Sequence, residues 1–244
     1  TGYPIARVSA KIAVGLRLDE IRLANTPACF EPALDYVVTK LPRFPFDKFP
    51  AAQNTLSTQM KATGEVMSVG RTFEESLLKG IRSLEDGKNH LHLEKFDSAH
   101  MTVDQLMEYI KNGTDDRLYA ISQLMWLGVD PARICDVTQI DMFFLDKIRK
   151  IVDFERELEQ NIASLPHLRE AKRLGFSDSY VAELWHWSED GVYALRCRAE
   201  IFPVYKMIDT CASEFESYVP YFYSTYAEEN ESVVTGRKKV IVLG

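Results

Sequence analysis

From residue 101 onward the sequence repeats one pattern, and this pattern restricts the second half of the chain to a helical fold. Each unit has a capping residue, an apolar stripe at helical spacing and a stop, as in the capping box of Thr102 and Gln105 and the Asp130-Pro131 start. Glycines or prolines such as Gly113, Gly128 and Pro166 mark the ends. We predict helices starting near Val103, Leu118 and Pro131, a long helix over 144–162 that Pro166 ends, and helices over 167–174, 178–185 and 189–200.

Two corners in this region resemble each other at an offset of 47 residues. Gly128-Val129-Asp130 precedes Ile134, Val137 and Ile140, and Gly175-Phe176-Ser177 precedes Val181, Leu184 and Trp187. Each corner is a glycine stop, a capping residue and an apolar stripe. Two copies are too few for a solenoid, so we expect one small helical domain with two similar helix corners.

Residues 1–87 mix helix and strand. Ile5, Val8 and Ile12 predict an amphipathic helix over 5–14, and β-branched runs predict strands over 36–40, ended by Pro42, and over 65–69. Thr72 with Glu75 is a capping box for a helix that ends near Asp86-Gly87. The predicted fold class is therefore an α+β portion followed by an all-α domain.

The last 42 residues change character again. Aromatic residues from Tyr218 to Tyr226 predict extended chain, and the polar stretch 228–238 reads as a linker. Residues 239–244 are a continuous apolar run that ends in glycine, which is typical of a buried strand opening a following α/β domain. Because such a strand needs a sheet and the chain has no initiator Met, we expect a piece of a longer protein.

Composition excludes several classes of function. The net charge of −7 argues against nucleic acid as the main partner, since phosphate binding needs a basic surface. No apolar run reaches the roughly 18 residues that a membrane helix needs, so we expect no membrane partner. The four cysteines, Cys29, Cys135, Cys197 and Cys211, form no C-x-x-C pair and indicate reduced thiols in a cytoplasmic protein.

Candidate sites are few, and each has a structural interpretation. His90 and His92 lie two residues apart with His100 nearby, but no cysteine completes a metal set. Gly175-Phe176-Ser177 with its flanking helices has the spacing of a DNA-reading helix corner. The N-terminal end of the recognition helix would be Ser188-Glu189-Asp190, which would repel phosphate. Phosphate loops, nucleophile elbows and zinc-protease motifs are absent from the sequence. We therefore predict no catalytic, cofactor-binding or metal-binding residue.

Several segments, in order along the chain, resemble the large subunit of carbamoyl-phosphate synthetase. The most specific is the 17-residue stretch from Gln59 to Glu75, QMKATGEVMSVGRTFEE. Further segments of this resemblance are 1–6, 29–36, 39–44, 203–206, 209–215, 223–226 and 240–244.

This resemblance implies a division of the chain and a function for its parent. Residues 1–87 would be the C-terminal part of the first, carboxyphosphate-forming ATP-grasp module, and 88–227 the helical oligomerisation domain. Residues 228–238 would link them to the carbamoyl-phosphate-forming half, whose first strand would be 239–244. The parent would be an ATP-dependent ligase that makes carbamoyl phosphate from bicarbonate, ammonia from glutamine and ATP, for arginine and pyrimidine synthesis. It would use ATP with Mg or Mn, whose ligands lie outside this chain, a glutaminase small subunit and homo-oligomerisation.

The only site residues that the resemblance implies line a tunnel. The family passes carbamate through an internal tunnel, and the segment Met60 to Thr63 is similar to part of its wall; a core role for Met60 is the alternative. Thr63 stands where the family more often has an aliphatic residue. An isolated fragment of this kind would be inactive. The alternative functions are a non-catalytic helical self-association module and a DNA-binding protein.

Overall fold

The computed structural model describes residues 3–23, 26–31, 34–209 and 221–242. The chain divides into two compact units, one formed by Tyr36–Phe202 and the other by Thr1–Asp35 together with Pro203–Gly244. Cys211, Tyr218 and nearly all of the 209–215 segment lie outside the described residues.

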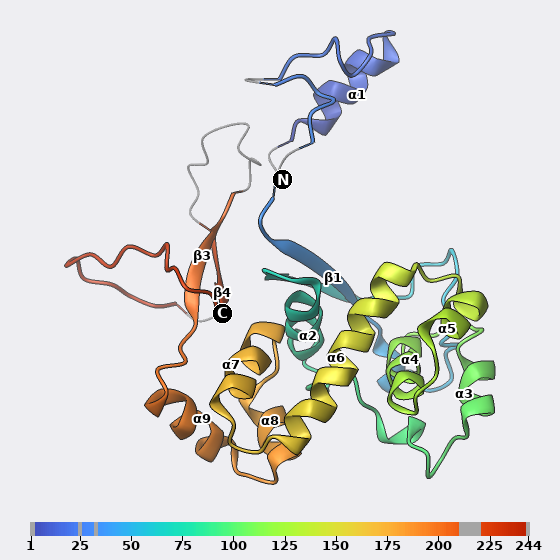
Figure 1. Cartoon of the computed structure of the whole chain (residues 1–244). Coiled ribbons are helices and arrows are strands. Elements are labelled where there is room, and N and C mark those ends of the chain that lie inside the picture. Colours follow the sequence, from blue (N-terminus) through green and yellow to red (C-terminus); the bar gives the residue numbers. More distant parts are fainter. Residues whose placement is uncertain (1–2, 24–25, 32–33, 210–220, 243–244) are drawn as a thin grey trace. The chain divides into compact units, whose positions relative to one another are not determined.

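The unit Tyr36–Phe202 is built around one long helix, α6 (Met142–Gln160), which crosses it in Figure 1. Helices α4 and α5 pack on one side of α6 and helices α7 and α8 on the other. On the predicted apolar stripe of this helix, Ile148, Ile151, Val152 and Leu158 are buried, whereas Phe144 and Ile162 at its two ends are exposed. The other helices are α2 (Phe73–Ser83), α3 (Val103–Tyr109), α4 (Arg117–Trp126), α5 (Pro131–Thr138), α7 (Leu165–Leu174), α8 (Asp178–Trp185) and α9 (Glu189–Arg198), with 3-10 turns η1 (Pro45–Asp47) and η2 (Glu94–Phe96).

The predicted helix starts are confirmed by their capping contacts. Thr102 and Gln105 form the reciprocal capping box, with the Thr102 backbone N donating to the Gln105 side chain at 2.8 Å. The Asp130 carboxylate accepts a hydrogen bond from the Ala132 backbone N at 2.8 Å, directly before Pro131. Local sequence therefore sets where these helices begin.

Pro166 does not end the long helix, as the sequence predicted, but lies in the next helix. The long helix already ends at Gln160, and Pro166 lies in the first turn of α7. A proline is favourable there because its missing N–H would have no helical partner in any case. Ala163 adopts a positive φ of 59° in the short connection, so the chain reverses between α6 and α7.

The two similar corners are confirmed. Gly128 and Gly175 both adopt positive φ, 85° and 94°, at the ends of α4 and α7. The next residue in each corner, Val129 or Phe176, is buried, and the residue after that caps the following helix. Each glycine thus allows a tight helix end that places an apolar side chain in the core.

The β part of this unit is one antiparallel pair. Strand β1 (Val37–Arg43) pairs with β2 (Gly64–Gly70), with Val37 opposite Gly70 and Arg43 opposite Gly64. The pair continues through Pro42, where the sequence predicted an end, because proline is tolerated in strands that are not central. The fold class, an early β part before a helical domain, is confirmed.

Helix α2 contacts both the strand pair and the helices of this unit. It packs on β1 and β2 and also contacts α6 and α7. The compact unit therefore spans the boundary placed between residues 87 and 88, since contacts of α2 bind the strands and the helices together. The assignment of the four segments to modules of a parent protein remains a prediction.

The other unit contains a short helix and a second strand pair. In α1 (Ile5–Ala13), Val8 packs with Ile21 and Ala28, and the Tyr3 hydroxyl donates to the Ala28 carbonyl at 2.8 Å. Ile12, on the predicted apolar stripe, is nearly half exposed. Strand β3 (Val204–Ile208) pairs antiparallel with β4 (Tyr221–Thr225), which confirms the extended chain predicted around Tyr221.

The strand predicted for 239–244 is not found. Residues 239–242 lie in no strand, and Val240, Ile241 and Val242 are more than four-fifths exposed. A strand requires a hydrogen-bonded neighbour, and the described residues provide none for this segment. Leu243 and Gly244 lie outside the described residues. Residues 228–238 are irregular, as predicted for a linker.

Candidate functional site

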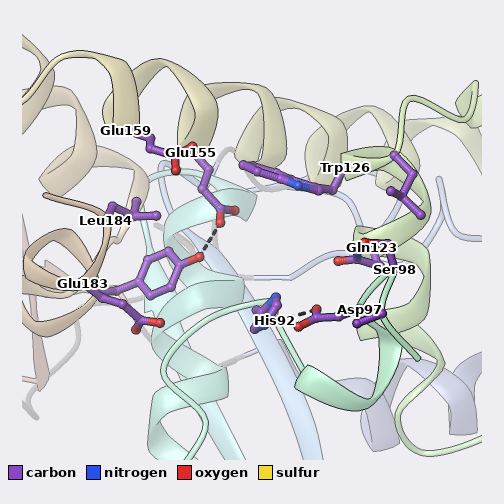
Figure 2. A pocket seen from close by; sticks show the side chains of 12 residues that line it. His92, Asp97, Ser98, Gln123, Trp126, Glu155, Glu159, Glu183 and Leu184 are labelled. Carbon is purple, nitrogen blue, oxygen red and sulfur yellow. Dashed lines mark hydrogen bonds and ion pairs between the residues drawn. The ribbon is translucent and has the colours of Figure 1, made fainter. Parts of the chain in front are cut away.

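A cavity of about 440 Å³ opens in the helical unit between α4, α6, α8 and the segment that precedes α3 (Figure 2). Its wall is mainly polar and includes side chains from all four elements. The lining residues are His92, Asp97, Ser98, Ala99, Gln123, Trp126, Leu127, Glu155, Glu159, Tyr180, Glu183 and Leu184.

Glu155 of α6 is a buried carboxylate in this wall. The Tyr180 hydroxyl of α8 donates to Glu155 Oε1, and His90 Nε2 lies 3.1 Å from Glu155 Oε2. The imidazole of His90 also stacks on the Tyr180 ring, with centroids 3.9 Å apart. Burial, and then the adjacent Glu155, raise the pKa of Tyr180, so the phenol remains a proton donor. The cluster holds the segment before α3 against α6 and α8.

The outer part of the cavity carries further acidic and aromatic groups. His92 Nε2 lies 3.4 Å from Asp97 Oδ1, while Glu159 and Glu183 lie on the side of α6 and α8 (Figure 2). The Trp126 ring has the Arg156 guanidinium 5.0 Å from its centroid. As far as the described residues go, no lysine or arginine lines the cavity. This set does not fit the phosphates of ATP, which need cationic or backbone N–H partners.

A second buried charge cluster joins α7, α8 and α9. Asp178 lies 2.7 Å from Lys172 Nζ and 2.9 Å from Arg196 Nη2. Lys172 also donates to the Phe176 carbonyl at 2.7 Å, and Arg196 to the Ile201 carbonyl at 3.0 Å. Burial alone would raise the pKa of Asp178, but the two cations outweigh it and hold that pKa below its ordinary value. The cluster has the contacts of a structural network.

A third cluster attaches α2 to α6. The Glu74 side chain is completely buried, with Lys150 Nζ at 3.3 Å and Lys147 Nζ at 3.6 Å. Burial opposes ionisation of Glu74, but a backbone hydrogen bond and the two lysines lower its pKa overall. The neighbouring Phe73 ring contacts Phe144 at a centroid distance of 5.5 Å. These contacts fix the first turn of α2 on the helical domain.

One comparison with known proteins decides the family. A family model described as the carbamoyl-phosphate synthetase large chain, oligomerisation domain, matches residues 65–200. This match covers more than half of the chain, from β2 through α9. The chain belongs to this family. The resemblance that was inferred from the 59–75 segment is thereby confirmed.

The two predicted tunnel residues, Met60 and Thr63, lie in the loop before β2, ahead of the residues that the family model matches. Met60 is 92% exposed in this chain. Thr63 is also exposed, and its backbone N donates to the Arg43 carbonyl at 3.0 Å. Their tunnel role stays a prediction.

His90 and His92 of this oligomerisation domain contact different residues. His90 contacts Glu155, whereas His92 contacts Asp97. In the part of the chain that the structure describes, no three His, Cys, Asp or Glu side chains are placed to hold a metal ion. The contact between His90 and Glu155 was not predicted from the sequence, because no local pattern links residues that are 65 positions apart.

The remaining sequence candidates have packing roles. Phe176 of the helix corner is buried and contacts Phe154, with ring centroids 5.6 Å apart. Ser188 caps α9 through the Gly191 backbone N at 3.1 Å. Cys29, Cys135 and Cys197 are free thiols. Among the described residues, no helix is long and apolar enough to cross a membrane.

Proposed function

We propose that this chain is the scaffold and association part of a carbamoyl-phosphate synthetase large chain. The parent would be an ATP-dependent ligase that makes carbamoyl phosphate from bicarbonate, glutamine-derived ammonia and ATP for arginine and pyrimidine synthesis. The observation that carries the proposal is the family match across 65–200, which coincides with most of the compact unit Tyr36–Phe202.

The charged clusters support a scaffold role. The carboxylates of Glu74, Glu155 and Asp178 each join different helices through contacts within the unit. A catalytic acid or base would instead present its polar atoms to a substrate. We propose that ATP and Mg or Mn bind to other parts of the parent, that a glutaminase small subunit supplies the ammonia, and that the assembly is cytoplasmic.

Self-association follows from the family description, which names an oligomerisation domain. We propose that the helical unit makes this homo-oligomeric contact. Strands β1 and β2 pack on α2, which also contacts α6 and α7. We propose that β1, which precedes the family match, belongs to the first ATP-grasp module, and that its contacts with β2 and α2 hold that module on the association domain.

The proposed tunnel role of the loop before β2 can be tested in the full-length large chain with its glutaminase partner. Met60→Trp places a bulky ring on an exposed position, so it should fold normally but obstruct a channel that passes there. We expect carbamoyl phosphate formation to fall at least about tenfold while bicarbonate-dependent ATP hydrolysis persists. The measurement compares the two rates in the same preparation.

Met67→Trp is the matched control, because Met67 is also exposed but lies within β2. It should change neither rate by more than about twofold. If Met60→Trp leaves the two rates coupled as in the unaltered enzyme, the loop does not line the path of carbamate. Thr63→Val should be tolerated in the same assay, since it introduces the aliphatic type at that position.

A further inference from the structure

Helix α9 has one face that is exposed along its whole length. The helix packs on α8, and its Val192 and Arg196 side chains are buried. Asp190, Ala194 and Arg198 follow one another at a spacing of four residues, so they share a face, and all three are exposed. Ala194 is two residues, or about 200° of rotation, from each of the two buried side chains. The row Asp190–Ala194–Arg198 therefore lies on the side of α9 that faces away from its own unit.

This row carries opposite charges at its two ends. Asp190 is in the first turn of α9 and Arg198 is in the last, and in the part of the chain that the structure describes neither side chain takes part in an ion pair. Exposed aromatic side chains lie near the row, since Tyr193 is 54% exposed and Trp187 is 41% exposed. A Cβ atom at Gly191 would lie 3.7 Å from the Trp187 ring, which places this ring against α9. Aromatic side chains are enriched where proteins contact one another.

We propose that α9 packs antiparallel on α9 of a second copy of this chain, about a two-fold axis that passes beside Ala194. Asp190 and Arg198 are each four residues from Ala194, in opposite directions, so Asp190 of each copy would lie opposite Arg198 of the other. This arrangement forms two ion pairs, whereas a parallel pair of helices in register would place like charges opposite each other. The small Ala194 side chain allows the helices to approach closely, and Tyr193 would be covered beside them.

This inference rests on the self-association proposed above and identifies the surface that makes it. The family description names the second copy as the occupant, because it is that of an oligomerisation domain. The charge pattern of α9 selects the surface, because the pattern is complementary to itself when the second helix is reversed.

Charge reversal at either end of the row tests this contact by sedimentation velocity of the 244-residue chain. Asp190→Arg replaces both ion pairs with facing arginines, and Arg198→Asp replaces them with facing carboxylates. Each variant alone should therefore associate with a dissociation constant at least about tenfold higher than that of the unaltered chain.

An equimolar mixture of the two variants should recover association to within about threefold of the unaltered chain. In the mixed dimer one copy contributes two arginines and the other two carboxylates, so both contacts again join opposite charges. Recovery also shows that each variant is folded, because a misfolded chain would not be rescued by mixing.

The matched controls are Asp136→Arg and Arg133→Asp, which reverse the same charges at exposed positions of α5. Each should associate within about twofold of the unaltered chain. If the unaltered chain associates but the α9 variants behave like these controls, or their mixture does not recover, α9 is not the contact and the proposed self-association stands. An unaltered chain that is monomeric at every concentration would contradict the self-association itself, and the α9 contact with it.

Discussion

Replacing Gly175 with alanine should lower the free energy of unfolding by about 3–4 kcal/mol. Gly175 adopts φ of 94°, a conformation that costs about 1–2 kcal/mol for a residue with a Cβ atom. A Cβ at this position would also lie 2.9 Å from the Glu75 Cα and 3.0 Å from the Glu75 carbonyl oxygen. Because both atoms are backbone, α2 and α7 would have to move apart.

Gly128 provides the control for this prediction, since it occupies the equivalent place in the other corner. Its φ is 85°, but a Cβ there would meet no atom within 4 Å. Gly128→Ala should therefore lower the free energy of unfolding only by the cost of a positive φ, about 1–2 kcal/mol. Urea unfolding of the two variants measures the difference directly. Equal losses would mean that α2 does not approach α7 as closely as the structure shows.

Replacing Asp178 with asparagine should destabilise the fold by about 3 kcal/mol at neutral pH. The change removes the carboxylate that lies 2.7 Å from Lys172 Nζ and 2.9 Å from Arg196 Nη2, and both cations are buried. Losing the carboxylate of a buried pair costs more than losing an exposed pair, because it no longer offsets the desolvation of the cations. Guanidinium or urea unfolding at neutral pH measures the loss.

Asp153→Asn is the control for this second variant. Asp153 pairs with Arg149 at 2.9 Å, but both side chains are partly exposed, so the variant should lose less than about 1 kcal/mol. Similar losses in the two variants would contradict the structural role of the Asp178 cluster.

The effect of Asp178 should also depend on pH in a defined direction. Its pKa is lowered in the folded state from the ordinary value of 3.8. A lowered carboxyl pKa contributes stability that is present above pH 3.8 and is lost as the pH falls through the folded-state pKa. The stability difference between the unaltered chain and Asp178→Asn should therefore shrink in acid below pH 3.8. A constant difference across this range would contradict the pairing.

The helices could be predicted from sequence because their signals are local. Thr102, Asp130 and Gly175 each set a helix end through contacts within a few residues, so the pattern and the structure agree. Pro166 was misplaced because a proline signal is compatible with the end of one helix or the first turn of the next.

The charge clusters could not be predicted. Glu74, Glu155 and Lys172 are charged residues within helices, yet all three are buried. Their partners lie on other helices, and Glu155 and His90 are 65 positions apart. Propensity and periodicity describe one element at a time, so pairings between elements require the folded structure.

The family could be inferred from the 59–75 segment, whereas the cavity could not. Trp126, Glu155 and Glu183 lie on three helices, and nothing in their local sequence indicates that they line one cavity. The resemblance also drew attention to Met60, which is exposed in this chain.

Sedimentation velocity of this chain over a wide range of concentration measures whether the helical unit associates. If the helical unit is an association domain, species larger than the 27.9 kDa monomer should form and increase with concentration. A single monomeric species at every concentration, from a chain whose circular dichroism shows the helices intact, would contradict this role.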